Sequence, residues 1–413
     1  MEKDFIKVSK ITLESNHLKV DFTVSDNLNH YFKELFFWAE YSKDITNTPE
    51  SIAVLPFVCN VLPIIWVTDS ILIIDEIDED FYDNLNAIKK GYKEMYPMLD
   101  FRGEITIENV IKNSIESHSD NVACLFSGGV DAFATLFDHI DEKPQMITIW
   151  GGDVKLTDDE GWKIAENHIQ NTAKECHLPN PIIVKSNFVD FINQIECNHL
   201  VKCTKYNYWY GLQHGIGMIS LVAPIAYHLN LNKIYIASSF TIKERGIIPC
   251  ASDPSIDNNM HFAGIKIWHD QYDKNRQQKV SLITSFCNKN NLRILLRTCY
   301  MPDAKGGNCC HCEKCLRSIY GILAENNEPK VFGFNLDRND LKKSTKSFLR
   351  KLPWQSKYVK LMWTDIQNRF KETQAFNEDS SINWIFNYNF MHEPFLLDKV
   401  DHYYNAILHR LKL

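Results

Sequence analysis

The chain has 413 residues, of which 45% are hydrophobic, 23% charged and 12% aromatic. This length favours two or three structural units over one core, and the composition is typical of a globular protein. The formal net charge of −7 provides no general attraction for nucleic acid, so no nucleic-acid partner is expected.

Residues 51–67 form a long apolar run without a charged residue. We interpret this run as two buried strands, because it contains Pro56, Asn60 and Pro63 and is barely long enough to span a bilayer. The first residues also lack the apolar core of a signal peptide. We therefore expect a cytoplasmic protein without membrane contact, in which the twelve cysteines are reduced or bind metal.

The first part of the chain, residues 1–118, is predicted to be an N-terminal α+β unit. Alternating apolar residues predict strands at 6–8 and 18–22, and a short apolar run predicts another at 71–75. Apolar residues at helical spacing predict a helix over 81–96.

In the middle of the chain, residues 119–330, predicted strands alternate with predicted helices. Strands are predicted at 122–126, 145–150, 181–185, 233–237 and 293–298, with helices at 132–139, 161–176, 211–229 and 277–288. Strands separated by helices of this length indicate an α/β fold with a doubly wound parallel sheet. Helices predicted at 341–352, 357–373 and 399–411, with Pro353 as a stop, make residues 331–413 a helical C-terminal extension.

A phosphate-binding turn is the strongest single signal, within VACLFSGGVDAFATLF at residues 122–137. Ser127, Gly128 and Gly129 separate a predicted strand from a predicted helix. Glycines let the backbone approach an anion closely, and the helix amino terminus supplies amide donors. Asp131 would repel a bare phosphate, so it implies Mg²⁺ or a role in orienting the loop. The alternative is a tight turn in which Asp131 is the helix N-cap.

The segment Ser127-Gly128-Gly129-Val130-Asp131 resembles the signature of the PP-loop ATP pyrophosphatases. The resemblance implies a PP-loop (HUP-like) sheet and cleavage of ATP between its α and β phosphates, with AMP passed to an oxygen of the substrate. These five residues would then hold the departing pyrophosphate and Mg²⁺. Ala132 departs from the pattern, since most members carry a second serine there.

A cluster of cysteines follows at residues 298–317, TCYMPDAKGGNCCHCEKCLR. Cys299, Cys309, Cys312 and Cys315 have a spacing that suits tetrahedral Zn²⁺ in a closed structural site, with Gly306 and Gly307 allowing the reversal between them. Cys310 or His311 could replace one of these ligands. An iron–sulfur cluster is the sharper alternative, and unliganded thiols are the other.

Cys299-Tyr300 together with Cys309, Cys312, Cys315, Leu316 and Arg317 resembles the 7-cyano-7-deazaguanine synthase (QueC-like) family. The resemblance covers residues 120–325, about half the chain. It implies a ligase that joins a deazaguanine-like carboxylate to an amine. It also places Lys279 where the family carries a lysine, as a further phosphate contact, although a solvated helix lysine is the alternative.

The substrate-facing segments depart from the family pattern. Gln213, His214 and Gly215 stand where an arginine and an asparagine are expected, and Trp150-Gly151-Gly152-Asp153 replaces a Tyr-Gly-Gln-Arg segment. The segment 249–257 keeps a proline, a cysteine and an acidic residue, Asp253, in another order. His214 is a candidate substrate contact or base, with a structural histidine as the alternative. Asp153 is a candidate ligand of substrate or Mg²⁺, with a turn cap as the alternative.

Three functions are therefore open. The first is an ATP-dependent ligase that adenylates a deazaguanine-like carboxylate and passes it to ammonia or to a protein amine, as the similarity to QueC-like proteins of antiphage operons implies. The second is a PP-loop tRNA thiolase, which would need a basic face and an exposed, acidic cysteine pair. The third is a non-catalytic QueC-like binding partner.

Overall fold

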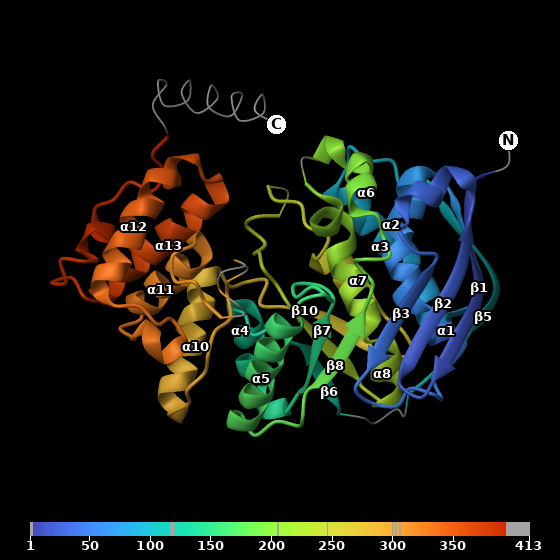
Figure 1. Ribbon diagram of the computed structural model, residues 1–413, viewed down its shortest axis with the longest axis horizontal. Helices are drawn as coiled ribbons and strands as arrows, with labels where there is room; N and C mark the ends of the chain where they lie inside the picture. The colour runs from blue at the N-terminus through green and yellow to red at the C-terminus, as the bar shows by residue number, and fades with distance from the viewer. Residues whose placement is uncertain are drawn as a thin grey trace. The chain divides into compact units, whose positions relative to one another are not determined.

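The computed structural model describes residues 3–115, 120–204, 206–245, 247–299, 301, 304 and 307–393. The chain divides into two compact units, Met1–Lys274 and Asn275–Leu413 (Figure 1). This division differs from the boundaries expected near residues 118 and 330, the first of which falls at residues outside the described part.

A ten-stranded, mostly parallel sheet forms the centre of the first unit, in the order β10-β9-β6-β7-β8-β3-β2-β1-β4-β5. The strands are β1 (Phe5–Glu14), β2 (His17–Val24), β3 (Phe36–Tyr41), β4 (Ile71–Asp78), β5 (Glu104–Ile111), β6 (Val122–Leu125), β7 (Gln145–Trp150), β8 (Ile182–Ser186), β9 (Lys233–Ala237) and β10 (Lys266–Asp270). Helices cover both faces of its later half, so the fold is α/β and compatible with the predicted doubly wound arrangement.

The later half of the sheet, β10-β9-β6-β7-β8, is parallel throughout. From β6 the chain proceeds to β7 and β8 on one side and then returns to β9 and β10 on the other. Helices α4 (Val130–Asp138) and α5 (Asp159–Glu175) connect the first three strands, whereas α7 (His214–Leu221) and α8 (Ala223–His228) precede β9. The reversal of strand order beside β6 is a topological switch point, where α/β folds bind ligands outside the carboxyl ends of the strands.

The earlier strands extend the same sheet instead of forming one of their own. β3 pairs antiparallel with β8, with Ala39 opposite Ser186. One apolar core joins both halves, because Ile6, Ile74 and Ile234 all belong to it. This continuity explains why the compact unit extends from the amino terminus to Lys274.

The prediction of two strands in residues 51–67 is wrong, since this run forms helices α1 (Glu50–Ala53) and α2 (Leu55–Thr68). Pro56 lies in the first turn of α2, where its missing amide costs nothing. Asn60 is buried and donates to the Pro56 and Gly217 carbonyls. The helix is surrounded by apolar neighbours, so it lacks the alternation of polar and apolar residues by which a helix is recognised.

The remaining helices of this unit include α3 (Glu79–Met95), α6 (Gln194–Leu200) and α9 (Pro254–Asp257). The prediction of a helix over 211–229 is confirmed, but the helix is divided. A π-helical turn, η4 (Trp209–Gln213), leads into α7, and a second helix, α8, follows with Pro224 in its first turn. Shorter 3₁₀ turns are η1 (Asp26–Tyr31), η2 (Ile140–Glu142) and η3 (Lys202–Thr204).

The second unit is helical in its described residues. It contains α10 (Arg276–Asn290), α11 (Glu313–Ala324), α12 (Arg338–Lys351) and α13 (Lys357–Thr373), with 3₁₀ turns η6 (Pro329–Phe332), η7 (Leu352–Trp354) and η8 (Asn383–Phe386). The strand predicted at 293–298 is wrong: all of these residues are described and none is in a strand, and Leu296 N instead donates to Phe332 O at 3.0 Å. The helix predicted at 399–411 lies outside the described residues.

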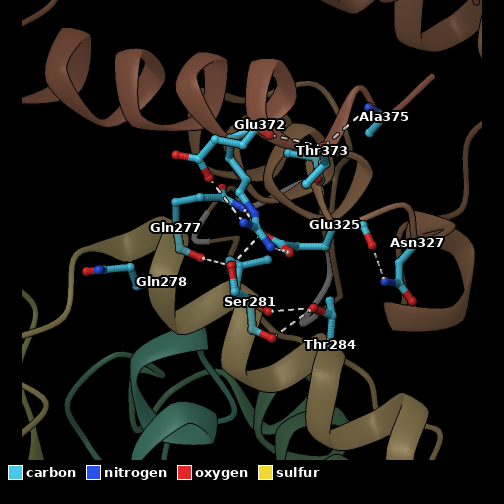
Figure 2. A network of polar contacts seen from close by, with 12 residues as sticks. Gln277, Gln278, Ser281, Thr284, Glu325, Asn327, Glu372, Thr373 and Ala375 are labelled. Atoms are coloured by element: carbon cyan, nitrogen blue, oxygen red, sulfur yellow. Dashed lines mark hydrogen bonds and ion pairs between the residues drawn. The ribbon is translucent and has the colours of Figure 1, made fainter. Parts of the chain in front are cut away.

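A polar network around Glu325 joins three helices of the second unit (Figure 2). Arg369 of α13 donates to both carboxylate oxygens, at 2.9 and 2.8 Å. Gln277 and Ser281 of α10 donate to Glu325 Oε1. Because the Glu325 side chain is only 6% exposed, these bonds satisfy a carboxylate that burial alone would destabilise.

Candidate functional site

The loop after β6, where the sequence predicts a phosphate-binding turn, leads through a left-handed glycine into a helix. Phe126 continues the strand by donating its amide to Ile147 O at 2.8 Å. Gly128 then adopts a φ of +79°, a left-handed conformation that other residues adopt only with strain. Helix α4 begins directly after Gly129. The loop therefore ends at the amino terminus of a helix, beside the switch point of the sheet.

The N-cap of α4 is Gly129, so the alternative in which Asp131 caps this helix is wrong. Glycine supplies no side-chain acceptor, and the first amides of any helix have no acceptor within the helix. Gly129 N instead lies 3.4 Å from Ser127 Oγ. Val130 is buried and Asp131 is half-buried in the first helical turn. Residues 127–131 thus carry a hydroxyl, the first amides of α4 and one carboxylate within a single turn.

A second loop, after β7, carries Asp153. Gly151 has a φ of +117°, and a side chain there would approach Ser186 O within 2.0 Å, so this turn requires glycine. Gly151 N bonds to Val154 O at 3.2 Å, which closes the turn and leaves Asp153 exposed. The charge of Asp153 acts to raise the pKa of His214, so the structure brings these two predicted residues into one neighbourhood.

Two residues that the sequence analysis did not identify, Asp257 and His269, form a buried pair next to His214. His269 Nδ1 lies 2.7 Å from Asp257 Oδ2, which also accepts a hydrogen bond from Ser252 Oγ at 2.6 Å. Both side chains are almost completely buried. His269 Nε2, Asp257 Oδ1 and His214 Nδ1 are shielded from solvent and make no hydrogen bond. Buried polar atoms without partners mark a place for a ligand, an ion or water.

Burial favours the neutral form of His214 in this cluster. Burial lowers the pKa of its imidazole below the ordinary value of 6.5, and this effect outweighs Asp153 and Asp257, which raise it. Gly215 permits the close approach, because a side chain there would lie 2.7 Å from Asp257 Oδ1. The signal that could have revealed Asp257 is its position in the rearranged segment 249–257, where Asp253 was considered instead.

Other residues of the altered segments have structural roles. Gln213 is fully buried and bonds to Asn60 and to the Phe188 carbonyl, which joins α2 to α7. Asp253 is the N-cap of α9 and accepts from Ser255 N at 2.9 Å. These two side chains thus stabilise the elements around the site through structural hydrogen bonds.

In the second unit, four cysteines bring their sulfur atoms together. The Sγ atoms of Cys299, Cys309, Cys312 and Cys315 all lie within 4.8 Å of one another. Cys299 and Cys312 are 3.9 Å apart at sulfur, as are Cys309 and Cys315. Four sulfurs at 2.3 Å from one tetrahedral ion would be separated by about 3.8 Å. The cluster therefore fits a single metal ion such as Zn²⁺.

Local structure supports these four thiols as ligands. Amides of residues 301, 312 and 315 donate to the sulfurs of Cys299, Cys309 and Cys312 at 3.3, 3.3 and 3.5 Å. Cys312 is also the N-cap of α11, so the positive end of that helix stabilises a thiolate. In a multi-iron cluster, cysteine sulfurs that bind different irons lie further apart than the sulfurs do here, all of which are within 4.8 Å of one another. The spacing favours one ion over such a cluster.

Protons are shared unequally among these sulfurs. A hydrogen bond from Cys315, supported by the backbone, lowers the pKa of the Cys312 thiol to about 5. Burial raises the pKa of Cys309 to about 11, and the bond to Cys312 raises that of Cys315 well above its usual range. The Cys312 thiolate forms readily, and its negative charge disfavours deprotonation of the neighbouring thiols. A bound divalent cation would instead favour deprotonation of all four.

Neither proposed substitute ligand lies in this cluster. Cys310 has a φ of +59° and directs its thiol to Asn308 O at 3.5 Å. His311 is exposed, and its Nδ1 lies 2.9 Å from Cys309 O. Tyr300 and Gly306, on which the family resemblance and the turn also depend, lie outside the described residues. Lys279 is buried in α10 of the second unit, so the solvated alternative for this lysine is wrong.

The other cysteines do not resemble a thiolase pair. All twelve cysteines are described, and Cys203 alone among them is exposed. Burial raises the pKa of Cys176 to about 11 and that of Cys250 to about 12. Thiols in these settings are poor nucleophiles at neutral pH.

Within the described ranges, no helix is both long enough and apolar enough to cross a membrane. Comparisons with known proteins add no relative: no family model, no curated protein and no solved structure matches this chain.

Proposed function

We propose that the chain is an ATP-dependent, AMP-forming carbon–nitrogen ligase. The observation that carries this proposal is the turn at Ser127, Gly128 and Gly129, which joins β6 to the amino terminus of α4 beside the switch point of a parallel sheet. Such a turn favours a polyphosphate, because backbone donors and the helix dipole act on the same anion.

The substrate class follows from the QueC-like resemblance: a carboxylate on a 7-deazaguanine-like base. A carboxylate oxygen attacks the α-phosphorus of ATP, the bond to the β-phosphate oxygen breaks, and pyrophosphate leaves. The nitrogen of an amine then attacks the acyl carbon and loses a proton, and AMP departs as the amide forms. The amine is ammonia, or a protein amino group if the chain serves an antiphage pathway.

The loop residues have distinct roles in this proposal. The first amides of α4 and the Ser127 hydroxyl stabilise the charge that develops on pyrophosphate, which is usually the largest contribution to such a reaction. Asp131, half-buried beside them, would hold Mg²⁺ against the phosphates. Asp153, exposed after β7, is assigned to the substrate or to the same ion.

The amine loses a proton when the amide forms, and His269 is the group we assign to accept it. Asp257 fixes the imidazole through Nδ1 at 2.7 Å, so the lone pair of Nε2 points away from the carboxylate. Nε2 has no other partner, and His214 Nδ1 is similarly unpaired. A carboxylate that orients a histidine is the arrangement by which enzymes prepare a general base.

The alternatives are less well supported. A tRNA thiolase would need an exposed reactive cysteine pair, whereas Cys203 is the single exposed cysteine of the twelve. A partner module that binds only another protein would leave the buried polar atoms around His269 and Asp257 without a ligand, which is costly. The cysteine cluster, with all four positions occupied by sulfur, is assigned a structural role with Zn²⁺.

The experiment is an assay of pyrophosphate and AMP with ATP, Mg²⁺, 7-carboxy-7-deazaguanine and ammonia. We expect both products in equal amounts from the wild type and a loss of both in Asp131→Asn. Asp159→Asn is the matched control, because Asp159 occupies the first turn of α5 as Asp131 does in α4. If wild-type protein forms neither product with ammonia or with protein amines, the proposal is wrong.

A further inference from the structure

A second cluster of metal-ligand side chains lies in the first unit, on the face of the sheet that α4 covers. It comprises Asp138 and His139 at the end of α4 and Asp270 at the end of β10. Their ligand atoms all lie within 4.8 Å of one another, and His139 Nε2 is 3.2 Å from Asp270 Oδ1. Two carboxylates and one imidazole thus converge from two elements on one point.

The imidazole of His139 is fixed by contacts on the side away from Asp270. Its Nδ1 lies 2.7 Å from Glu142 Oε1, and its ring stacks on Tyr235 with centroids 3.8 Å apart. Glu142 is fixed in turn, because Tyr235 Oη donates to its two oxygens at 2.9 Å each. A carboxylate behind a histidine is the usual outer partner of a metal-binding imidazole, since it fixes the ring and leaves Nε2 to the ion.

Unpartnered buried atoms give independent support for a ligand at this point. Asp270 and Gln271 are only 6% and 4% exposed, yet Gln271 Oε1 makes no hydrogen bond and Asp270 Oδ2 makes none of ordinary geometry, although the Thr135 hydroxyl and the Gln271 amide act on the Asp270 carboxyl. The amide nitrogen of Gln271 lies 2.6 Å from Asp138 Oδ2, so the same amide reaches the cluster. Oxygens that are removed from water without partners are costly, and a cation at this point would satisfy them.

The donor set and the charge select the class of ion. Three carboxylates meet here, those of Asp138, Asp270 and Glu142. The nearby positive charge of Lys233, whose Nζ lies 3.1 Å from Tyr235 Oη, offsets only part of their negative charge. Carboxylate oxygens suit Mn²⁺ and Mg²⁺, whereas imidazole suits the transition metals. Asp138 is exposed, which provides an entry path and room for water ligands.

We infer that Asp138, His139 and Asp270 bind a divalent first-row transition-metal ion, with Glu142 as the positioning residue behind His139. This site is separate from the cysteine cluster and does not depend on the proposed ligase activity. It would fix the carboxyl end of α4, whose amino end carries the phosphate-binding turn, to β10.

The test is calorimetric titration of Mn²⁺ into the full chain, with zinc retained in the cysteine cluster. Wild-type protein is expected to bind one Mn²⁺. His139→Gln and Asp270→Asn should weaken binding at least tenfold, and Glu142→Gln should weaken it roughly ten- to hundredfold through loss of the orienting carboxylate. Asp141→Asn removes the same charge from the adjacent residue and should bind as wild type does.

Anomalous scattering from crystals soaked in Mn²⁺ provides a measurement that does not depend on variants that fold. A peak between His139 and Asp270 supports the inference. Absence of both a peak and a calorimetric signal in wild-type protein overturns it. Equal weakening by Asp141→Asn and Asp270→Asn would also overturn it, since that result indicates nonspecific attraction by the acidic surface.

Discussion

His269 and Asp270 are neighbours in β10, yet each forms an acid–histidine pair on a different face of the sheet. His269 Nδ1 lies 2.7 Å from Asp257, whereas Asp270 lies 3.2 Å from Nε2 of His139. The cause is the alternation of side chains along a strand. One strand end therefore contributes both to the proposed catalytic cluster beside α7 and to the proposed cation site beside α4.

The proposed phosphate-binding turn should depend on the left-handed conformation of Gly128. Gly128→Ala places a β-carbon at a φ of +79°, and this left-handed conformation costs about 1–2 kcal/mol for alanine. The variant loop should therefore populate other conformations more often. We expect ATP binding, measured by calorimetry with Mg²⁺, to weaken roughly tenfold or more. Unchanged affinity in a variant that folds as wild type does would show that the turn does not hold the nucleotide.

Removal of one cysteine ligand should abolish the metal binding proposed for the second unit. Cys312→Ser breaks the set of four sulfurs, and we expect the zinc content measured by plasma mass spectrometry to fall from one equivalent towards zero. Cys310→Ser is the matched control, because Cys310 bonds to Asn308 O and lies outside the cluster. If zinc is lost in Cys310→Ser but kept in Cys312→Ser, Cys310 is the ligand and the assignment of Cys312 is wrong.

Acid should destabilise the fold through His214. Its pKa in the folded chain is below the unfolded value, so the unfolded chain binds more protons in the window between the two values. The contribution of His214 to stability is therefore present above pH 6.5 and is lost as the pH falls below it. Urea unfolding at about pH 5.5 and 7.5 should give a smaller difference in His214→Asn than in wild-type protein. An equal or larger difference in the variant contradicts this assignment.

The Glu325 network should stabilise the second unit. Glu325→Gln leaves Arg369 without its bidentate partner and is expected to lower the free energy of unfolding by about 2 kcal/mol. Glu372→Gln removes the other carboxylate that Arg369 contacts, but this partner is 65% exposed and its loss should cost no more than about 0.5 kcal/mol. Chemical denaturation of both variants measures the difference, and equal effects would refute the role given to burial.

Local patterns were sufficient to predict much of this fold. The boundaries of β7 and β9 match their predicted ranges, and α13 matches its range as well. These elements have clear periodicity or sharp turn signals at their ends. The turn at Ser127–Asp131 was predicted for the same reason: glycine, hydroxyl and carboxylate follow one another within a few residues.

What the sequence could not reveal depends on contacts between distant residues. The run at 51–67 is buried on every side, so strand and helix have the same hydrophobic pattern there. The segment 293–298 has strand-like residues but no strand beside it to pair with. Asp257 and His269 are separated by a turn and a strand, and the pairing of β3 with β8 likewise joins residues far apart in the chain.

The transfer of oxygen from the acid to AMP tests the central claim most directly. The carboxylate of 7-carboxy-7-deazaguanine is labelled with oxygen-18, and the AMP formed with ATP, Mg²⁺ and an amine is analysed by mass spectrometry. Attack of the carboxylate on the α-phosphorus predicts one labelled oxygen in AMP and none in pyrophosphate. AMP without label, or label in pyrophosphate, would contradict adenylation of the acid by this chain.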